Sequence, residues 1–187
     1  MAAIITDQIR ILNARNFLSG ITTTGSSYYS FIGLPNATDI SSVWDNDPPA
    51  PVDNFDNENQ IWDTMIGLKK ITSSDARLVV PKVEWRSGNT FDMYRHDYST
   101  SNTATVSGAT NLYGASYYVM NSDYRVYICL ENGTTPETPN GAPSLDEPTF
   151  VDLEPRAAGA SGDGYIWKYL YTIAPADIVK FDSTNYI

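Results

Sequence analysis

The sequence predicts a mainly β protein with minor helices, of the α+β class. Residues 165–173 alternate between aromatic and other side chains with the two-residue period of a strand. Aromatic residues make up 12% of the chain, with 13 tyrosines, and such residues are enriched in strands. Prolines and glycines recur through residues 131–164 and exclude long helices there. These three observations favour a β body that carries long ordered loops.

The most informative stretch is the strand expected over residues 165–173. Gly162 and Gly164 flank Asp163 in a turn before it, and Pro175 ends it because proline cannot donate to a ladder. One face of this strand carries four rings and an isoleucine: Tyr165, Trp167, Tyr169, Tyr171 and Ile173. Two interpretations are open, namely a central core strand and an exposed aromatic platform on which sugars stack.

Two helices are expected in the first part of the chain. Residues 6–18 have an apolar 3–4 spacing, with Thr6 as the cap and Gly20 as the stop. Residues 53–68 combine acidic residues near the start with apolar i, i+4 pairs and should pack on a sheet.

Two strands and a loop are expected around these helices. Residues 28–34 form a continuous β run. Residues 76–84 form a second run that Pro81 interrupts, so it should lie at a sheet edge. The prolines of residues 35–51 predict an irregular loop, and Trp44 should anchor that loop to the body.

A hairpin is expected in the second half of the chain. Residues 116–120 and 124–130 are β runs, and the polar residues 121–123 between them suit a short turn. Cys129 is expected to be a small buried hydrophobic residue in the second run. Extended or irregular chain is expected over residues 85–100, 101–110, 131–164 and 177–187.

Charge excludes two classes of partner. The chain carries 12 Lys and Arg against 22 Asp and Glu, which gives a net charge of −10 and a pI near 4.3. Nucleic-acid binding needs a basic patch, and anionic membranes repel an acidic surface. We therefore expect no nucleic-acid partner and no membrane partner.

Few residues are suited to catalysis or to metal binding. Cys129 and His96 are the only cysteine and histidine, so Cys/His zinc sites of ordinary spacing are excluded, and so is a disulfide. The Gly162–Asp163–Gly164 run precedes a strand and therefore does not match a phosphate loop. Two acidic groups could attract calcium but fit helix capping or a solvated loop better: Asp45 with Asp47, and Asp53 with Asp56 and Glu58. We expect no enzyme activity, cofactor, metal or small-molecule substrate.

Length and segment composition favour one β-rich body over residues 1–187. The chain shows no repeat of fixed period and no clean domain boundary. No segment approaches the ~20 apolar residues of a spanning helix, and the first residues do not match a secretory signal. Synthesis in a cytoplasm is expected, with the protein staying there or leaving by lysis.

The run GDGYIWKYLYTI, followed by APADIVKF and TNYI, resembles the baseplate wedge subunit of T-even-like contractile-tailed phages, the gene product eight family. Further matches follow in the same order along the chain. They are NARNFLSGI, YYSFIGLP, IWDTMIGLKKI, VVPKVEW and YRVYICLENG. Cyanophage wedge proteins look most similar. The matches are short and scattered over nearly the whole chain.

This resemblance implies a layered antiparallel β-sandwich with small helical additions. It also implies a non-enzymatic virion protein of the tail baseplate that contacts other wedge and tail proteins and forms a homodimer within the wedge. Family members are longer, so residues 1–187 are expected to be a shorter relative or the N-terminal part of a longer wedge protein.

Loop aromatics are the expected interface residues, since buried aromatic anchors dominate protein interfaces. We select Trp44, Trp85 and Tyr94, each of which could instead anchor a loop on its own domain. A carbohydrate-binding or receptor-binding module of a virion is the alternative function, and it requires exposed rings. A glycosidase is a third possibility, and it requires two carboxylates roughly 5–10 Å apart in a cleft.

Overall fold

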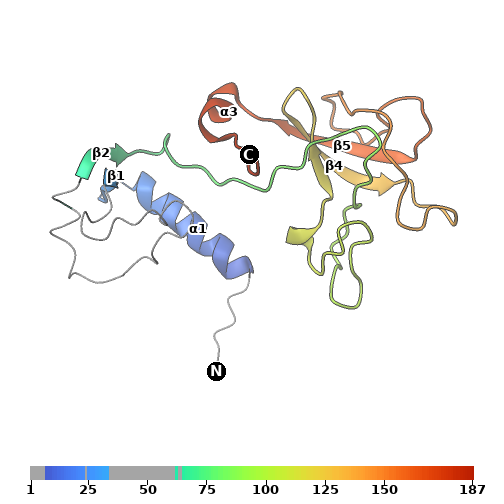
Figure 1. Cartoon of the computed structure of the whole chain (residues 1–187), viewed down its shortest axis with the longest axis horizontal. Helices are drawn as coiled ribbons and strands as arrows, with labels where there is room; N and C mark the ends of the chain where they lie inside the picture. The colour runs from blue at the N-terminus through green and yellow to red at the C-terminus, as the bar shows by residue number, and fades with distance from the viewer. Residues whose placement is uncertain (1–6, 24, 34–61, 63–64) are drawn as a thin grey trace, which may run out of the picture. The chain divides into compact units, whose positions relative to one another are not determined.

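The structure is a computed structural model that describes residues 7–23, 25–33, 62 and 65–187 (Figure 1). The chain divides into two compact units, residues 1–78 and residues 79–187, and each is described by itself. The described residues combine helices with two small antiparallel sheets, which agrees with the expected α+β class.

The first unit holds helix α1 (Asp7–Thr22) and a two-stranded antiparallel sheet of β1 (Tyr28–Gly33) and β2 (Met65–Ile71). The helix and the first strand confirm the expectations for residues 6–18 and 28–34. The helix passes Gly20, however, and ends where the Thr22 and Thr23 hydroxyls donate to the carbonyl of Ser19 at 2.7 and 3.0 Å. These hydroxyls satisfy a backbone carbonyl at the carboxyl end of the helix. The sequence had instead predicted that the helix would end at Gly20.

The helix expected over residues 53–68 is wrong at its carboxyl end. Residues 65–68 belong to β2, while Trp62 is helical and residues 53–61 and 63–64 lie outside the described residues. Pairing with β1 supplies the backbone hydrogen bonds of β2, and such tertiary pairing overrides a local helical pattern.

The second unit is built on a sheet with strand order β3-β4-β5 (Figure 1). Its strands are β3 (Tyr118–Met120), β4 (Arg125–Asn132) and β5 (Tyr165–Thr172), and all pair antiparallel. The expected hairpin is confirmed. Its turn ends at Tyr124, which has a φ of +57°. The strand expected over residues 165–173 is also confirmed, but the central strand of the sheet is β4, not β5.

One face of this sheet is covered by an aromatic core. Trp167 is fully buried, stacks on Tyr165 with ring centroids 5.2 Å apart, and meets the Phe91 ring edge-on at 5.8 Å. Its indole Nε1 has no hydrogen-bond partner among the described residues. The buried cluster comprises Phe91, Val119, Tyr127, Cys129, Phe150, Tyr165 and Trp167. The first two rings of the expected aromatic face, Tyr165 and Trp167, therefore belong to the core.

The aromatic face of β5 changes its surroundings at a bulge. The register with β4 shifts between Val126 and Tyr127, so that Tyr171 pairs with Val126 and Tyr169 with Tyr127. A bulge re-aims the side chains that follow it. Tyr171 is consequently 51% exposed, whereas Tyr165 is 1% exposed. The alternating pattern of side chains in the sequence of this strand could not reveal this shift in register.

Cys129 is buried in the core, as expected. Burial raises the pKa of its thiol well above the ordinary value, because the apolar surroundings disfavour the thiolate.

We expect a thiol reagent to leave Cys129 unmodified in the native protein at neutral pH and to modify it fully in denaturant. The thiolate is the reactive form, and in the native protein it is both disfavoured and inaccessible. Absorbance from a disulfide-exchange reagent, recorded with and without urea, measures this. Rapid stoichiometric reaction of the native protein would contradict the buried position.

A buried carboxylate organises the chain between the core and β3. Asp92 is fully buried. Its Oδ1 accepts hydrogen bonds from the backbone N–H groups of Val106 and Ser107 at 2.9 and 3.3 Å, and its Oδ2 accepts one from Ser116 at 2.9 Å. The short 3₁₀ helix η1 (Leu112–Gly114) lies within the segment that these bonds close.

The long loop expected over residues 131–164 is confirmed from residue 133 onward, because β4 continues to Asn132. Its two ends meet at a pair of glycines. The N–H of Gly133 donates to the carbonyl of Gly164 at 3.2 Å, and the φ values are +68° and +78°. A β-carbon on Gly133 would collide with the carbonyl of Asp163, so only glycine fits this closure.

The end of the chain corrects two further expectations. Residues 175–181 form helix α3 (Pro175–Phe181), not an extended tail. Pro175 in its first turn, Asp177 near its start and Lys180 in its last turn are all favourable there. These signals were present in the sequence.

Residues 185–187 then run beside residues 80–82, an arrangement that we name the C-terminal clasp. Val80 and Ile187 exchange backbone hydrogen bonds of 2.9 and 3.1 Å, and the N–H of Lys82 donates to Asn185 at 2.8 Å. Pro81 forms only an isolated bridge, so the strand expected over residues 76–84 is replaced by this irregular pairing.

The Lys82 side chain closes the clasp. Its Nζ lies 2.8 Å from Asp182 Oδ1 and 3.5 Å from Glu84 Oε1. The hydrogen bond to Asp182 raises the pKa of Lys82 above its ordinary value, so the ammonium form is retained.

Candidate interaction surface

An apolar pocket lies on the second unit, on the sheet face that the aromatic core leaves uncovered. Val119 belongs to the core cluster, so its strand neighbours Tyr118 and Met120 point to the opposite face. The pocket there has a volume of about 180 Å³. It is lined by Val80, Val83, Tyr117, Tyr118, Met120, Val126, Leu170, Tyr171 and Ile187. A cavity of this size and lining suits one large apolar side chain.

The walls of the pocket are held by hydrogen bonds. The N–H of Met120 donates to the carbonyl of Val83 at 2.7 Å, and the Tyr118 hydroxyl donates to the carbonyl of Pro81 at 2.7 Å. The C-terminal clasp fixes the wall that carries Val80 and Ile187. The pocket is therefore pre-formed, which lowers the cost of filling it.

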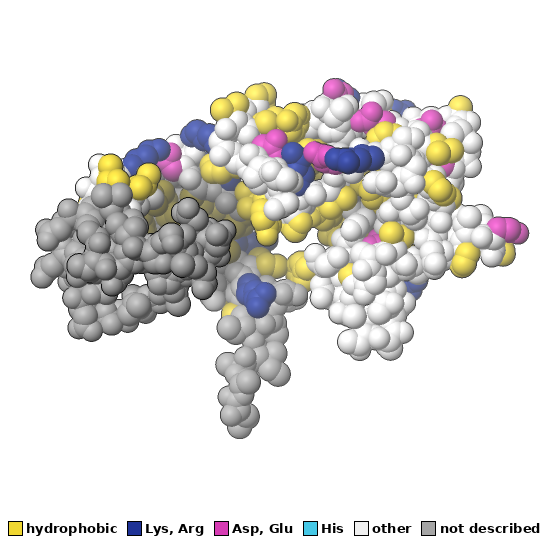
Figure 2. Space-filling view, in the orientation of Figure 1, with side chains coloured by type: hydrophobic (Ala, Val, Ile, Leu, Met, Phe, Trp, Pro, Cys, Tyr) yellow, Lys and Arg dark blue, Asp and Glu magenta, His cyan; other side chains and the backbone are white. Residues whose placement is uncertain are grey.

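Three tyrosines extend the apolar surface beyond the pocket, and we call them the tyrosine row. The ring of Tyr117 meets the ring of Tyr94 edge-on at 5.5 Å and that of Tyr118 at 5.4 Å. Tyr94 is 41% exposed. Hydrophobic side chains also reach the surface elsewhere on the visible side of the molecule (Figure 2). Tyrosine presents a large rigid area together with a polar hydroxyl, which suits protein interfaces.

Burial changes the pKa of two tyrosines of the row, Tyr117 and Tyr118. Desolvation raises the pKa of Tyr117 and raises the pKa of Tyr118 to about 12. The folded state therefore favours the neutral phenol at Tyr118. This contribution to stability is complete below the ordinary pKa of 10.0 and is lost as pH rises from there toward 12.

We expect a Tyr118→Phe variant to lose part of the late alkaline tyrosinate titration, while Tyr165, whose pKa burial also raises to about 12, still titrates late. The wild type should ionise this phenol together with unfolding, because the phenolate is disfavoured in the native state. Ultraviolet absorbance of tyrosinate, recorded with circular dichroism across alkaline pH, checks this. Tyr113→Phe, at a 53% exposed tyrosine, is the matched control. Identical late titration in the wild type and Tyr118→Phe would contradict the assignment.

The residues selected from the sequence lie in different places. Trp44 lies outside the described residues. Trp85 is half-buried, packs against the core, and donates from Nε1 to Ser144 Oγ at 3.0 Å, so it anchors its loop on its own unit. Tyr94 belongs to the tyrosine row. As interface residues all three stay predictions.

Sequence reasoning missed most of the pocket. Tyr118 could have been found, because it lies in the strand predicted over residues 116–120, whose alternate residues must face away from the core. The pairing of Val80 with Ile187 could not, because residues 185–187 carry no strand pattern that would match them to the run expected over residues 76–84.

The described residues offer no centre for metal chemistry. Within residues 7–23, 25–33, 62 and 65–187, no group of three or more His, Cys, Asp or Glu side chains could hold a metal ion. The calcium candidates at Asp45, Asp47, Asp53, Asp56 and Glu58 lie outside those residues. No helix among those described is long and apolar enough to cross a membrane.

The aromatic platform proposed for sugar stacking loses its basis. Trp167 and Tyr165 are buried, so their faces are not open to a glycan. Tyr171 is exposed, but it stands apart from those two rings on the far side of the bulge.

Two comparisons with known proteins give the same result. The family model described as bacteriophage T4, Gp8 matches residues 3–149. The baseplate wedge protein gp8 of Enterobacteria phage T4 is 25% identical over 214 aligned residues, which cover 99% of this chain. The chain spans 60% of the length of that curated relative.

Proposed function

Because the chain belongs to the bacteriophage T4 Gp8 family, we propose that it is a structural subunit of a phage tail baseplate wedge. The observation that carries this proposal is the match of one family model to residues 3–149, which is most of the chain. The baseplate role of the T4 relative is transferred on that basis. The subunit then resides in the tail baseplate of the virion, after synthesis in the host cytoplasm.

The second unit supports a role in assembly. A pre-formed apolar pocket beside a row of half-exposed tyrosines has the composition of an interface centre, where a few aromatic anchors provide most of the affinity. We infer that other wedge and tail proteins insert an apolar side chain here. Tyr94 and Trp85 then lie at or beside this contact.

Three finer proposals come with the family. The subunit pairs with a second copy within the wedge, and it acts without catalysis, nucleic acid, membrane, cofactor or small-molecule substrate. A second layer packs on the apolar side of β3-β4-β5 to complete a layered sandwich. Support for that layer comes from the exposure of apolar pocket residues on a face that sheets normally bury.

Cross-linking mass spectrometry on intact phage particles tests the role. Lys69 has a side chain that is 70% exposed and should react, whereas Lys82 is 11% exposed and ion-paired and serves as the internal unreactive control. We expect cross-links from the reactive lysines to other tail proteins. Absence of the chain from particles, with the protein found only in free form in the lysate, would overturn the proposal.

A further inference from the structure

The two-stranded sheet of the first unit has an apolar face whose side chains stay exposed among the described residues. Cross-strand partners share a face, and here Tyr29 lies opposite Lys70 while Phe31 lies opposite Leu68. We name these four residues the outer face of the sheet. Tyr29, Phe31 and Leu68 are 54%, 47% and 53% exposed. Ile66, at the adjacent register shift, is 66% exposed.

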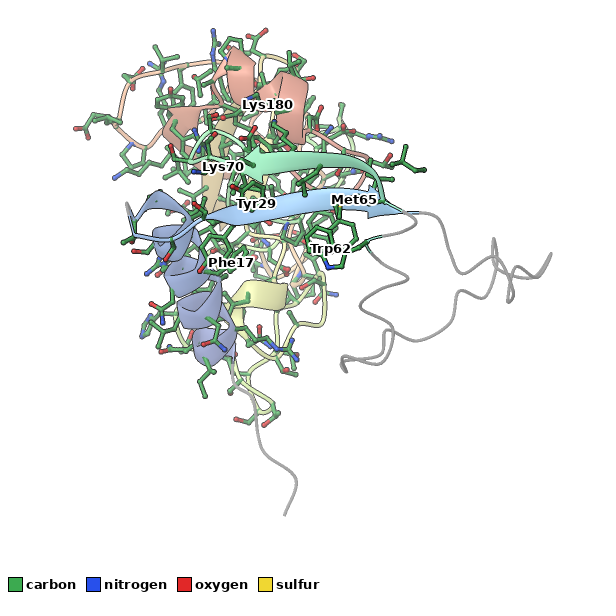
Figure 3. All side chains as sticks on the ribbon, turned by 90° about the vertical axis from the view of Figure 1, so that its left-hand side faces the viewer. Phe17, Tyr29, Trp62, Met65, Lys70 and Lys180 are labelled. Carbon is green, nitrogen blue, oxygen red and sulfur yellow. The ribbon has the colours of Figure 1, made fainter. Side chains whose placement is uncertain are left out.

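Helix α1 contacts the opposite face of the same sheet at Tyr28, while Ile32 on that face stays 71% exposed. The Tyr28 ring meets the Phe17 ring of α1 edge-on at 5.6 Å, and Lys69 Nζ lies 2.6 Å from Asp75 Oδ1. Figure 3 shows Tyr29 and Lys70 on the neighbouring strands. A two-stranded sheet is marginal in water unless a face is packed. Helix α1 therefore supports the Tyr28 end of the opposite face, whereas the outer face presents the more continuous apolar surface and is left uncovered by the described residues of the first unit.

Charge decides what kind of partner fits. Lys70 is exposed, and no carboxylate among the described residues pairs with it, in contrast to Lys69. Covering the outer face brings Lys70 out of water, which is costly unless the partner supplies an anion. An identical outer face from a second copy offers a lysine and no carboxylate. If two copies packed their outer faces together, their Lys70 ammonium groups would therefore repel each other.

We propose that the outer face of β1 and β2 binds an apolar segment of a different tail protein that places a carboxylate beside Lys70. This inference rests on the proposed baseplate function and adds the position and the chemistry of one contact. Tyr29, Phe31 and Leu68 supply the apolar area, and the Lys70 ammonium sets orientation and partner choice.

A matched pair of neutralising substitutions tests the contact. Lys70→Gln removes the outer-face charge, and Lys69→Gln removes the neighbouring charge from the opposite face. Each full-length variant is supplied to a phage that lacks this gene, and its amount in purified particles is measured relative to free protein. We expect Lys70→Gln to fall by at least about tenfold, because the partner carboxylate loses its cation. Lys69→Gln and Lys70→Arg should stay within about twofold of wild type, since an exposed pair contributes little and arginine keeps the charge.

A second measurement identifies the neighbour. A photo-reactive benzoylphenylalanine replaces Leu68 on the outer face or Ser30 on the opposite face. We expect Leu68 to cross-link in particles to an Asp- or Glu-containing peptide of another tail protein, and Ser30 not to. Cross-links confined to this chain or to a second copy, equal cross-links from both positions, or normal incorporation of Lys70→Gln would overturn this inference. Wild-type protein missing from particles would instead overturn the baseplate role.

Discussion

Replacing Trp167 by alanine is expected to reduce the free energy of unfolding of the 79–187 unit by about 3–5 kcal/mol. The indole is fully buried and packs on two rings of the core, Tyr165 and Phe91. Its removal leaves a cavity at the centre of a small unit, where the surrounding sheet can relax only in part. Because domains are marginally stable, a loss of this size should leave much of the unit unfolded at 37 °C.

Urea denaturation followed by circular dichroism measures the effect, with Trp167→Phe as the matched variant. Phenylalanine keeps most of the buried ring and removes an Nε1 group that has no described partner. We expect a clearly smaller loss for phenylalanine than for alanine. Equal losses would show that the indole N–H, not the packing, stabilises the unit.

Replacing Asp92 by alanine is expected to cost about 3 kcal/mol, because three part-buried backbone hydrogen bonds to a charged acceptor are lost. The donors belong to Val106, Ser107 and Ser116. The segment between them should open locally while the aromatic core stays folded. Amide hydrogen exchange at those three positions should accelerate far more than at β4.

Asp92→Asn distinguishes the role of the carboxylate from that of side-chain volume. The amide keeps one oxygen for Val106 and Ser107, but its NH₂ group faces the N–H of Ser116. We expect the Asn variant to lie between wild type and Asp92→Ala, with fast exchange at Ser116. Unchanged exchange in both variants would contradict the organising role.

Local patterns were sufficient for elements whose neighbours agree with them. The strand at β5 and the hairpin of β3 and β4 have side-chain periods and turn residues that match their surroundings. At residues 65–68 the helical spacing of apolar residues conflicts with pairing to β1, and the pairing decides the outcome. Long-range partners of this kind leave no local signal.

The candidate interaction surface was likewise predictable at some residues and not at others. The outward direction of Tyr118 follows from strand alternation, and the loop position of Tyr94 was visible in the sequence. The pocket itself depends on residues 80 and 187 meeting, and on a bulge that redirects Tyr171. Neither the contact between residues 80 and 187 nor the bulge follows from a periodic pattern in the sequence, so the surface could be predicted only in part.

The C-terminal clasp has a mechanical consequence. Residues 80–82 and 185–187 run antiparallel, with Val80 opposite Ile187, so the chain enters and leaves the pair at the same end. A force that pulls residues 79 and 187 apart would break these hydrogen bonds one after another, beginning at Val80. Each bond contributes only about 1 kcal/mol, so the pair resists such a pull weakly. A force that acts on this unit is therefore resisted better by its packed side-chain surfaces than by the hydrogen bonds of the clasp.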